Sequence, residues 1–117
     1  MVRTHKHLDA WIVSRALVKR VYEVTGSFPA TETYGLTAQL RRAAISLASN
    51  IAEGAARNSR KEFSRFLGIA RGSLSEIETQ LILAEDLGMY IPDKSLADTV
   101  ARLFLLLSAL KNRLDTA

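Results

Sequence analysis

The chain has two histidines, His5 and His7, and their spacing is the first feature that suggests chemistry. A His-x-His pair can supply two metal ligands, but protein metal sites need three or four ligands held by a supporting shell. The surrounding segment offers no third ligand, and the chain has no cysteine. The sequence therefore predicts no metal site and no cofactor.

The acidic residues do not form a catalytic pair either. Glu76 and Glu78 are two positions apart, so they do not face each other on a helix. Glu53 lies near Asn50 but has no neighbouring acid or base that would support general acid–base catalysis. We interpret Asn50 and Glu53 as a structural junction that fixes the end of a helix through hydrogen bonds to backbone or arginine.

The glycines do not build a phosphate-binding loop. Gly54, Gly68, Gly72 and Gly88 match neither the G-x-G-x-x-G pattern nor the Walker A pattern. Gly68 and Gly72 are spaced as G-x-x-x-G, which in a charged helix indicates close packing against another helix rather than pairing in a membrane. Since no catalytic constellation is present, we expect no enzymatic activity.

Basic residues are the strongest functional signal. The net charge is +4, but residues 1–71 carry +7 and residues 72–117 carry −3. Arginine side chains suit phosphate oxygens, and a helix N-terminus adds backbone N–H groups. The predicted nucleic-acid-binding residues are Arg41, Arg42, Arg57, Arg60, Lys61 and Arg65. This set lacks the interleaved aromatic residues that stack on bases, so binding would be directed to phosphates. An acidic protein surface, or solvation alone, would satisfy the same charges.

Four amphipathic stretches position these residues. Helices are predicted at about 9–25, from 34 or 36 to 56, at 59–87 and at 93–114. Ser59-Arg60-Lys61-Glu62 matches a capping box, in which Ser59 accepts from the N–H of Glu62 and Glu62 reaches back to Ser59. No period-2 run competes with the helices. The predicted fold is an all-α, antiparallel up-down-up-down four-helix bundle. It forms a single domain over residues 1–117, with residues 1–7 as a flexible tail.

Apolar residues in the third and fourth helices repeat with the 4-3 spacing of a bundle seam. In the third helix the series is Phe63, Leu67, Ala70, Leu74, Ile77, Leu81 and Ala84. Five further apolar residues fall outside the expected core of a lone bundle, and they are Ile69, Leu83, Leu87, Phe104 and Leu105. A large apolar surface of this kind favours a homo-oligomer interface.

Several segments carry unusual residues in a fixed order. They are Gln39-Leu40-Arg41-Arg42-Ala43-Ala44, Ser49-Asn50-Ile51-Ala52-Glu53-Gly54, Lys61-Glu62-Phe63 and Glu76-Ile77-Glu78-Thr79-Gln80-Leu81. In these segments the chain resembles the bacterial four-helix-bundle proteins of the 23S rRNA-intervening sequence family. The resemblance implies a homo-oligomer, such as a homopentamer. It also relates the chain to the accessory variability proteins of diversity-generating retroelements, which bind nucleic acid through a basic surface and assist a reverse transcriptase.

Two functional hypotheses follow from the sequence. The first is a non-enzymatic, oligomeric bundle that binds nucleic acid, with RNA preferred. The alternative is a protein–protein adaptor, for example an accessory protein of a reverse transcriptase or another nucleic-acid enzyme. No apolar run approaches the ~20 residues of a membrane-spanning helix, and the first residues lack an apolar signal segment, so we expect a cytoplasmic protein.

Overall fold

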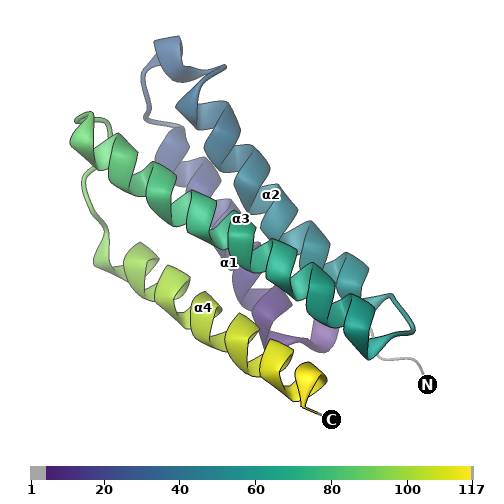
Figure 1. Cartoon of the computed structure of the whole chain (residues 1–117). Helices are drawn as coiled ribbons and strands as arrows, with labels where there is room; N and C mark the ends of the chain where they lie inside the picture. Colours follow the sequence, from purple (N-terminus) through teal and green to yellow (C-terminus); the bar gives the residue numbers. More distant parts are fainter. Residues whose placement is uncertain (1–4, 117) are drawn as a thin grey trace.

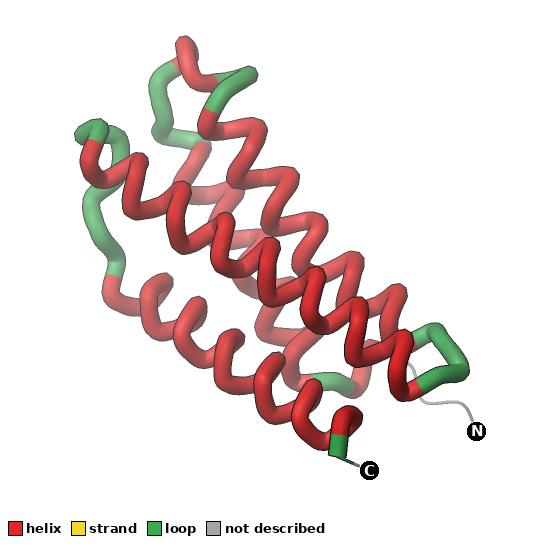
Figure 2. Tube along the Cα trace, in the orientation of Figure 1, coloured by secondary structure: helices red, strands yellow, loops and turns green. Residues whose placement is uncertain are grey.

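Four α-helices joined by short connections make up a computed structural model that describes residues 5–116 (Figure 1). The elements are η1 (His5–His7), α1 (Asp9–Thr25), η2 (Ala30–Glu32), α2 (Leu36–Ala55), α3 (Arg60–Asp86) and α4 (Lys94–Asp115). Within residues 5–116 every regular element is helical, as Figure 2 shows. The all-α prediction is therefore confirmed, and the predicted helix boundaries agree to within about two residues.

Consecutive helices run antiparallel, and α4 returns to pack against α1 as well as α3. The bundle measures 46 × 23 × 20 Å, and α2 and α3 make the most extensive contact within it. The turn at His5–His7 and the end of α4 lie at the same end of the bundle as the α2–α3 connection (Figure 1). The α1–α2 and α3–α4 connections lie together at the other end.

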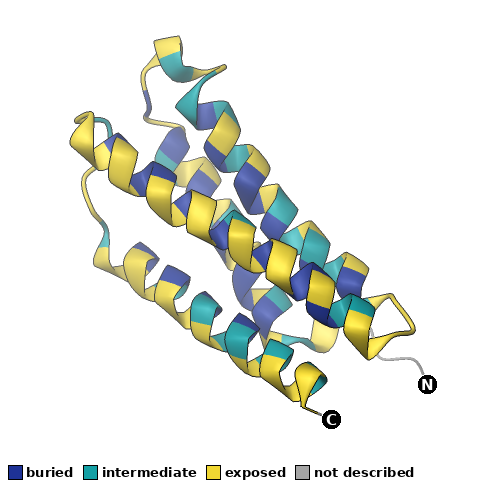
Figure 3. Ribbon diagram, in the orientation of Figure 1, coloured by how far each residue is buried: buried dark blue, intermediate teal, exposed yellow. Residues whose placement is uncertain are grey.

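The core consists of one apolar stripe from each helix, seen as the blue inward faces in Figure 3. Six of the seven predicted 4-3 positions of α3 are buried, and Phe63 is partly buried against the core. In α4 the buried residues are Leu96, Val100, Leu103 and Leu107. The predicted seam is therefore confirmed, because helical periodicity alone fixes which side of each helix faces its neighbours.

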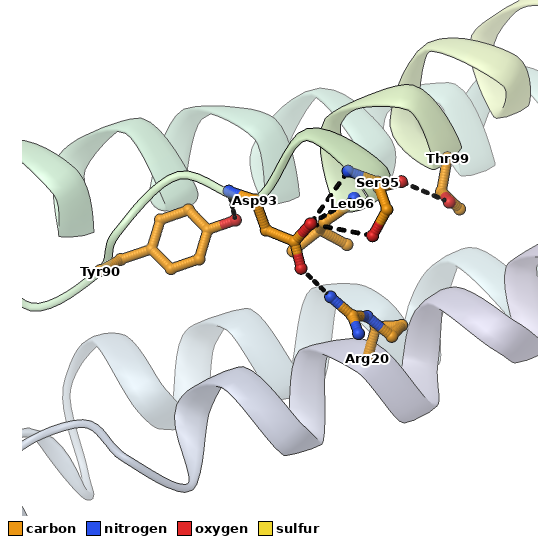
Figure 4. A network of polar contacts seen from close by, with 6 residues as sticks. All are labelled: Arg20, Tyr90, Asp93, Ser95, Leu96 and Thr99. Atoms are coloured by element: carbon orange, nitrogen blue, oxygen red, sulfur yellow. Dashed lines mark hydrogen bonds and ion pairs between the residues drawn. The ribbon is translucent and has the colours of Figure 1, made fainter.

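The α3–α4 connection is held by Asp93, the N-cap of α4 (Figure 4). Its Oδ1 accepts from the N–H of Ser95 at 2.9 Å and of Leu96 at 3.4 Å, and from the Ser95 hydroxyl at 2.8 Å. The N–H of Asp93 donates to the Tyr90 hydroxyl at 3.1 Å, and its other carboxylate oxygen pairs with Arg20 of α1. The hydrogen bond from the Ser95 side chain is the main cause that lowers the pKa of Asp93 below its usual value. One carboxylate thus starts α4 and ties it to α1.

The predicted flexible tail falls partly outside the described residues, which begin at His5. His5–His7 form a 3-10 turn, and the His5 ring lies edge-on to Trp11 with ring centroids 4.7 Å apart. This turn contacts both α1 and α2. The segment 5–7 is therefore docked on the bundle.

Candidate nucleic-acid interface

The α2–α3 connection places four of the predicted basic residues at one end of the bundle. α2 ends with the N–H of Ala56 bonded to the carbonyls of Ala52 and Glu53, and α3 begins after the N-cap Ser59. The Ser59 hydroxyl accepts from the N–H of Glu62 at 3.1 Å, so this half of the predicted capping box is confirmed. The exposed basic side chains of this turn are Arg57, Arg60, Lys61 and Arg65.

The end of α4 brings two more cations to the same place. Arg60 donates from Nη2 to the Arg113 carbonyl at 2.7 Å and from Nε to the Leu114 carbonyl at 3.4 Å. These are carbonyls that the helix end leaves without intrahelical partners. We call the set of cations gathered here the basic end, and it comprises Arg57, Arg60, Lys61, Arg65, Lys111 and Arg113.

A small polar cluster attaches α4 to α3 beneath the basic end. Lys111 Nζ donates to the hydroxyl of Ser64 and to Asp115 Oδ2, each at 3.0 Å, and the Ser64 hydroxyl donates to Asp115 Oδ1. The hydrogen bond from Ser64, followed by that from Lys111, lowers the pKa of Asp115. Ser64 is buried, and every member of the cluster is paired. The cluster is thus a structural tie that also neutralises Lys111.

Phe66 orients two of the guanidinium groups. The guanidinium carbon of Arg57 lies 5.0 Å from the ring centroid, and that of Arg65 lies 4.7 Å from it. Arg65 also donates to Glu62 through Nε at 2.8 Å, and this hydrogen bond lowers the pKa of Glu62 and raises that of Arg65. Glu62 therefore pairs with Arg65, and the predicted return bond from Glu62 to Ser59 is wrong. Arg65 competes successfully for Glu62 because it lies one turn after Glu62 on the same side of α3.

Arg41 and Arg42 do not belong to the basic end. They lie in the first two turns of α2, about 20 Å along the helix axis from its last residue, Ala55, at 1.5 Å per residue. Arg41 donates from Nε to the Thr25 hydroxyl at 2.8 Å, and its guanidinium carbon lies 4.5 Å from the Tyr22 ring centroid. Arg42 is exposed. The structure therefore divides the predicted set of six between the two ends of the bundle.

Asn50 and Glu53, predicted to form one structural junction, do not act together in the structure. Asn50 Nδ2 donates to the carbonyl of Ser46 at 2.8 Å and to its hydroxyl at 3.0 Å, and that hydroxyl accepts from Ser73 of α3. Asn50 therefore takes part in a polar contact between α2 and α3, away from the helix end. Glu53 is exposed, and among residues 5–116 no hydrogen bond or ion pair of its side chain is found. Backbone hydrogen bonds hold the end of α2, so the junction interpretation of Glu53 is wrong.

The residues predicted for an oligomer interface are mostly on the surface. Ile69, Leu83, Leu87 and Leu105 are exposed, and Leu105 retains 73% of its accessible surface. Phe104 instead packs against the core of its own chain. Sequence reasoning overlooked Ile12, Ile45 and Ile82, which are also exposed.

Helix dipoles add little to the potential of the basic end. The N-termini of α1 and α3 and the C-termini of α2 and α4 meet here, so positive and negative helix ends alternate and largely cancel. The field at this end therefore comes from side chains. Lys111 and Arg113 were absent from the sequence prediction, although an antiparallel bundle requires the end of the fourth helix to lie beside the start of the third.

The arrangement defines a class of protein: an antiparallel four-helix bundle with a basic end. Within residues 5–116, no cluster of three histidine, aspartate or glutamate side chains could hold a metal ion. No helix of this part of the chain is long and apolar enough to cross a membrane.

Comparison with known proteins identifies the family to which this chain belongs. The model of the 23S rRNA-intervening sequence protein family matches residues 6–111, so the chain belongs to this family. A search of curated proteins gives no match. The family match covers α1, α2 and α3 completely and most of α4, and it confirms the resemblance seen in the sequence.

Proposed function

We propose that this protein is a non-enzymatic bundle that binds nucleic acid, with RNA the expected ligand, through its basic end. The observation that carries the proposal is the gathering of exposed Arg57, Arg60, Lys61 and Arg65 beside Arg113. Guanidinium groups already oriented by Phe66 and by the end of α4 lose less side-chain entropy on meeting phosphate. Because contacts from arginine and lysine to phosphates carry no sequence information, the proposal is phosphate-directed binding with little sequence preference.

Replacing Arg57 and Lys61 together with glutamine is expected to weaken RNA binding about fivefold to tenfold near 0.1 M salt, because two phosphate contacts are lost. Glutamine preserves much of each aliphatic stem. The slope of log affinity against log salt should fall by about 1 to 2. The measurement is fluorescence anisotropy of a labelled single-stranded RNA titrated at several salt concentrations, with DNA of the same sequence in parallel.

The matched control is Arg42→Gln, which removes an exposed arginine at the opposite end of the bundle. Its affinity should stay within about twofold of the wild type, since Arg42 lies about two Debye lengths from the basic end at this salt. Salt-independent binding, absence of binding to RNA and DNA alike, or an equal loss in Arg42→Gln would each contradict the proposal.

We also infer that the protein assembles as a homo-oligomer. Support comes from the exposed side chains of Ile69, Leu83, Leu87 and Leu105, because isolated bundles rarely leave so many large apolar residues in water. Light scattering at micromolar concentration should give a multiple of the 12.9 kDa chain mass, and Leu105→Gln should reduce it. A stable 12.9 kDa particle would refute this inference.

A further inference from the structure

A groove of about 250 Å³ lies between α3 and α4, next to their connection. Its lining is mainly apolar, with Leu81 from α3 and Ala97 and Val100 from α4, and Tyr90 and Pro92 of the connection belong to it as well. Ile82 stands on the α3 side with 53% of its surface exposed. The groove therefore offers a partner apolar contact that the bundle itself does not use.

Two carboxylates flank this apolar contact. Glu78 and Glu85 both line the groove, and both are exposed. Neither side chain has a hydrogen bond or ion pair within the described part of the chain, whereas Asp93 at the end of the groove is already bound to Arg20 and Ser95 (Figure 4). Seven positions are two helical turns, so Glu78 and Glu85 lie on one side of α3, about 10 Å apart along its axis. Ile82 stands between them, and the edge of the groove presents an acid, an apolar residue and an acid.

We propose that this groove binds a helical segment of another protein that carries two basic residues seven positions apart with an apolar residue between them. Such a segment, laid along α3, places one cation opposite Glu78 and the other opposite Glu85. Its apolar side chain then enters the groove beside Ile82 and covers Val100. This is recognition of an amphipathic helix in a groove, with orientation and spacing set by charge complementarity.

The spacing favours a different protein over a second copy of this chain. Nowhere in the sequence are two lysine or arginine residues seven positions apart. No single helix of a second copy therefore offers the cation spacing that matches Glu78 and Glu85. The groove also lies at the end of the bundle opposite the basic end, so both surfaces are accessible at once. The inference is thus independent of the proposed nucleic-acid binding.

The test uses the full chain, isotopically labelled for NMR, and a synthetic alanine-based helical peptide of about 16 residues, long enough to form a helix in part. The peptide carries lysines seven positions apart and leucines three and four positions after the first lysine. A control peptide of identical composition has its lysines five positions apart, on different sides of the helix. Titration at low salt should shift the amide signals of Ile82, Ala97 and Val100, and the control peptide should bind about fivefold to tenfold more weakly.

Variants of the protein complete the test. Glu78→Gln with Glu85→Gln should erase the difference between the two peptides. Asp86→Asn removes a neighbouring exposed charge that does not line the groove, and it should preserve the difference. Equal affinity for both peptides in the wild type, or shifts confined to other helices, would overturn the proposal. Self-association that disappears in the double glutamine variant would instead assign the groove to a second copy and overturn it as well.

Discussion

Replacing Leu107 with alanine is expected to lower the free energy of unfolding by about 2–5 kcal/mol, the range for removal of a large buried side chain. Leu107 is fully buried and belongs to the core stripe of α4, the helix that packs against both α1 and α3. Alanine removes three carbon atoms and leaves a cavity, because the backbones of α1 and α3 are held by their own contacts and cannot close on it. Urea denaturation followed by far-ultraviolet circular dichroism measures the loss.

The matched control is Leu105→Ala, on the same helix and with the same atoms removed. Leu105 is 73% exposed, so its replacement in a single chain should change stability by less than about 0.5 kcal/mol. A loss at Leu105 that grows with protein concentration would indicate that a second chain covers this residue. Equal losses for the two variants in dilute protein would contradict the assignment of Leu107 to the core.

The buried apolar seams of α3 and α4 were predictable from the sequence because the repeat that defines each seam lies within a single helix. A 4-3 repeat states which side of a helix is apolar, and a short connection makes two such helices antiparallel neighbours. Leu67, Leu74 and Ile77 of α3 are accordingly all fully buried. The buried Gln80 shows the limit of such patterns. Its Nε2 donates to Gln39 and Glu76, but its Oε1 has no partner in the described structure, and no periodicity indicated a buried amide there.

The basic set was harder to predict because charge clusters in space depend on helix length and direction. Arg42 and Arg57 are close in sequence but lie at opposite ends of the rigid helix α2. Arg60 and Arg113 are far apart in sequence, and the antiparallel return of α4 brings them into contact. The net charges of the two halves of the chain also gave no indication that Arg113 contributes to the basic end, because Arg113 belongs to the half with net charge −3.

The glycines show most clearly what a pattern cannot decide. The G-x-x-x-G spacing of Gly68 and Gly72 indicated close helix packing, and that interpretation is wrong within the chain. Both residues are exposed on α3, and a methyl group added at Gly72 would meet no atom within 4 Å. The glycine in close contact with another helix is Gly54 of α2, which belongs to no G-x-x-x-G spacing. Only the tertiary path of α3 determines which glycine faces a neighbouring helix.

Replacing Gly54 with alanine is therefore expected to destabilise the protein by about 1–3 kcal/mol, even though alanine is the better helix former. The new methyl carbon would lie 2.7 Å from Cβ of Phe66 and 3.0 Å from Cδ1 of Phe63. A side-chain Cβ cannot rotate away, so relief requires α3 to move from α2, the most extensive helix contact in the bundle. Thermal and urea unfolding should both show the loss. Since Phe66 also orients Arg57 and Arg65, RNA affinity in the folded variant should fall as well.

Gly72→Ala makes the same chemical change at an open position, and its effect on stability should have the opposite sign to that of Gly54→Ala. The conformational freedom that glycine gains in the unfolded chain is reduced, and no atom is displaced, so stability should rise by about 0.5–1 kcal/mol. Opposite signs for the two substitutions would demonstrate that contact with α3, rather than helix propensity, requires glycine at position 54. A stabilising Gly54→Ala would mean that α2 and α3 do not approach as closely as Phe66 indicates. A destabilising Gly72→Ala would instead show that another chain packs against this side of α3 in solution.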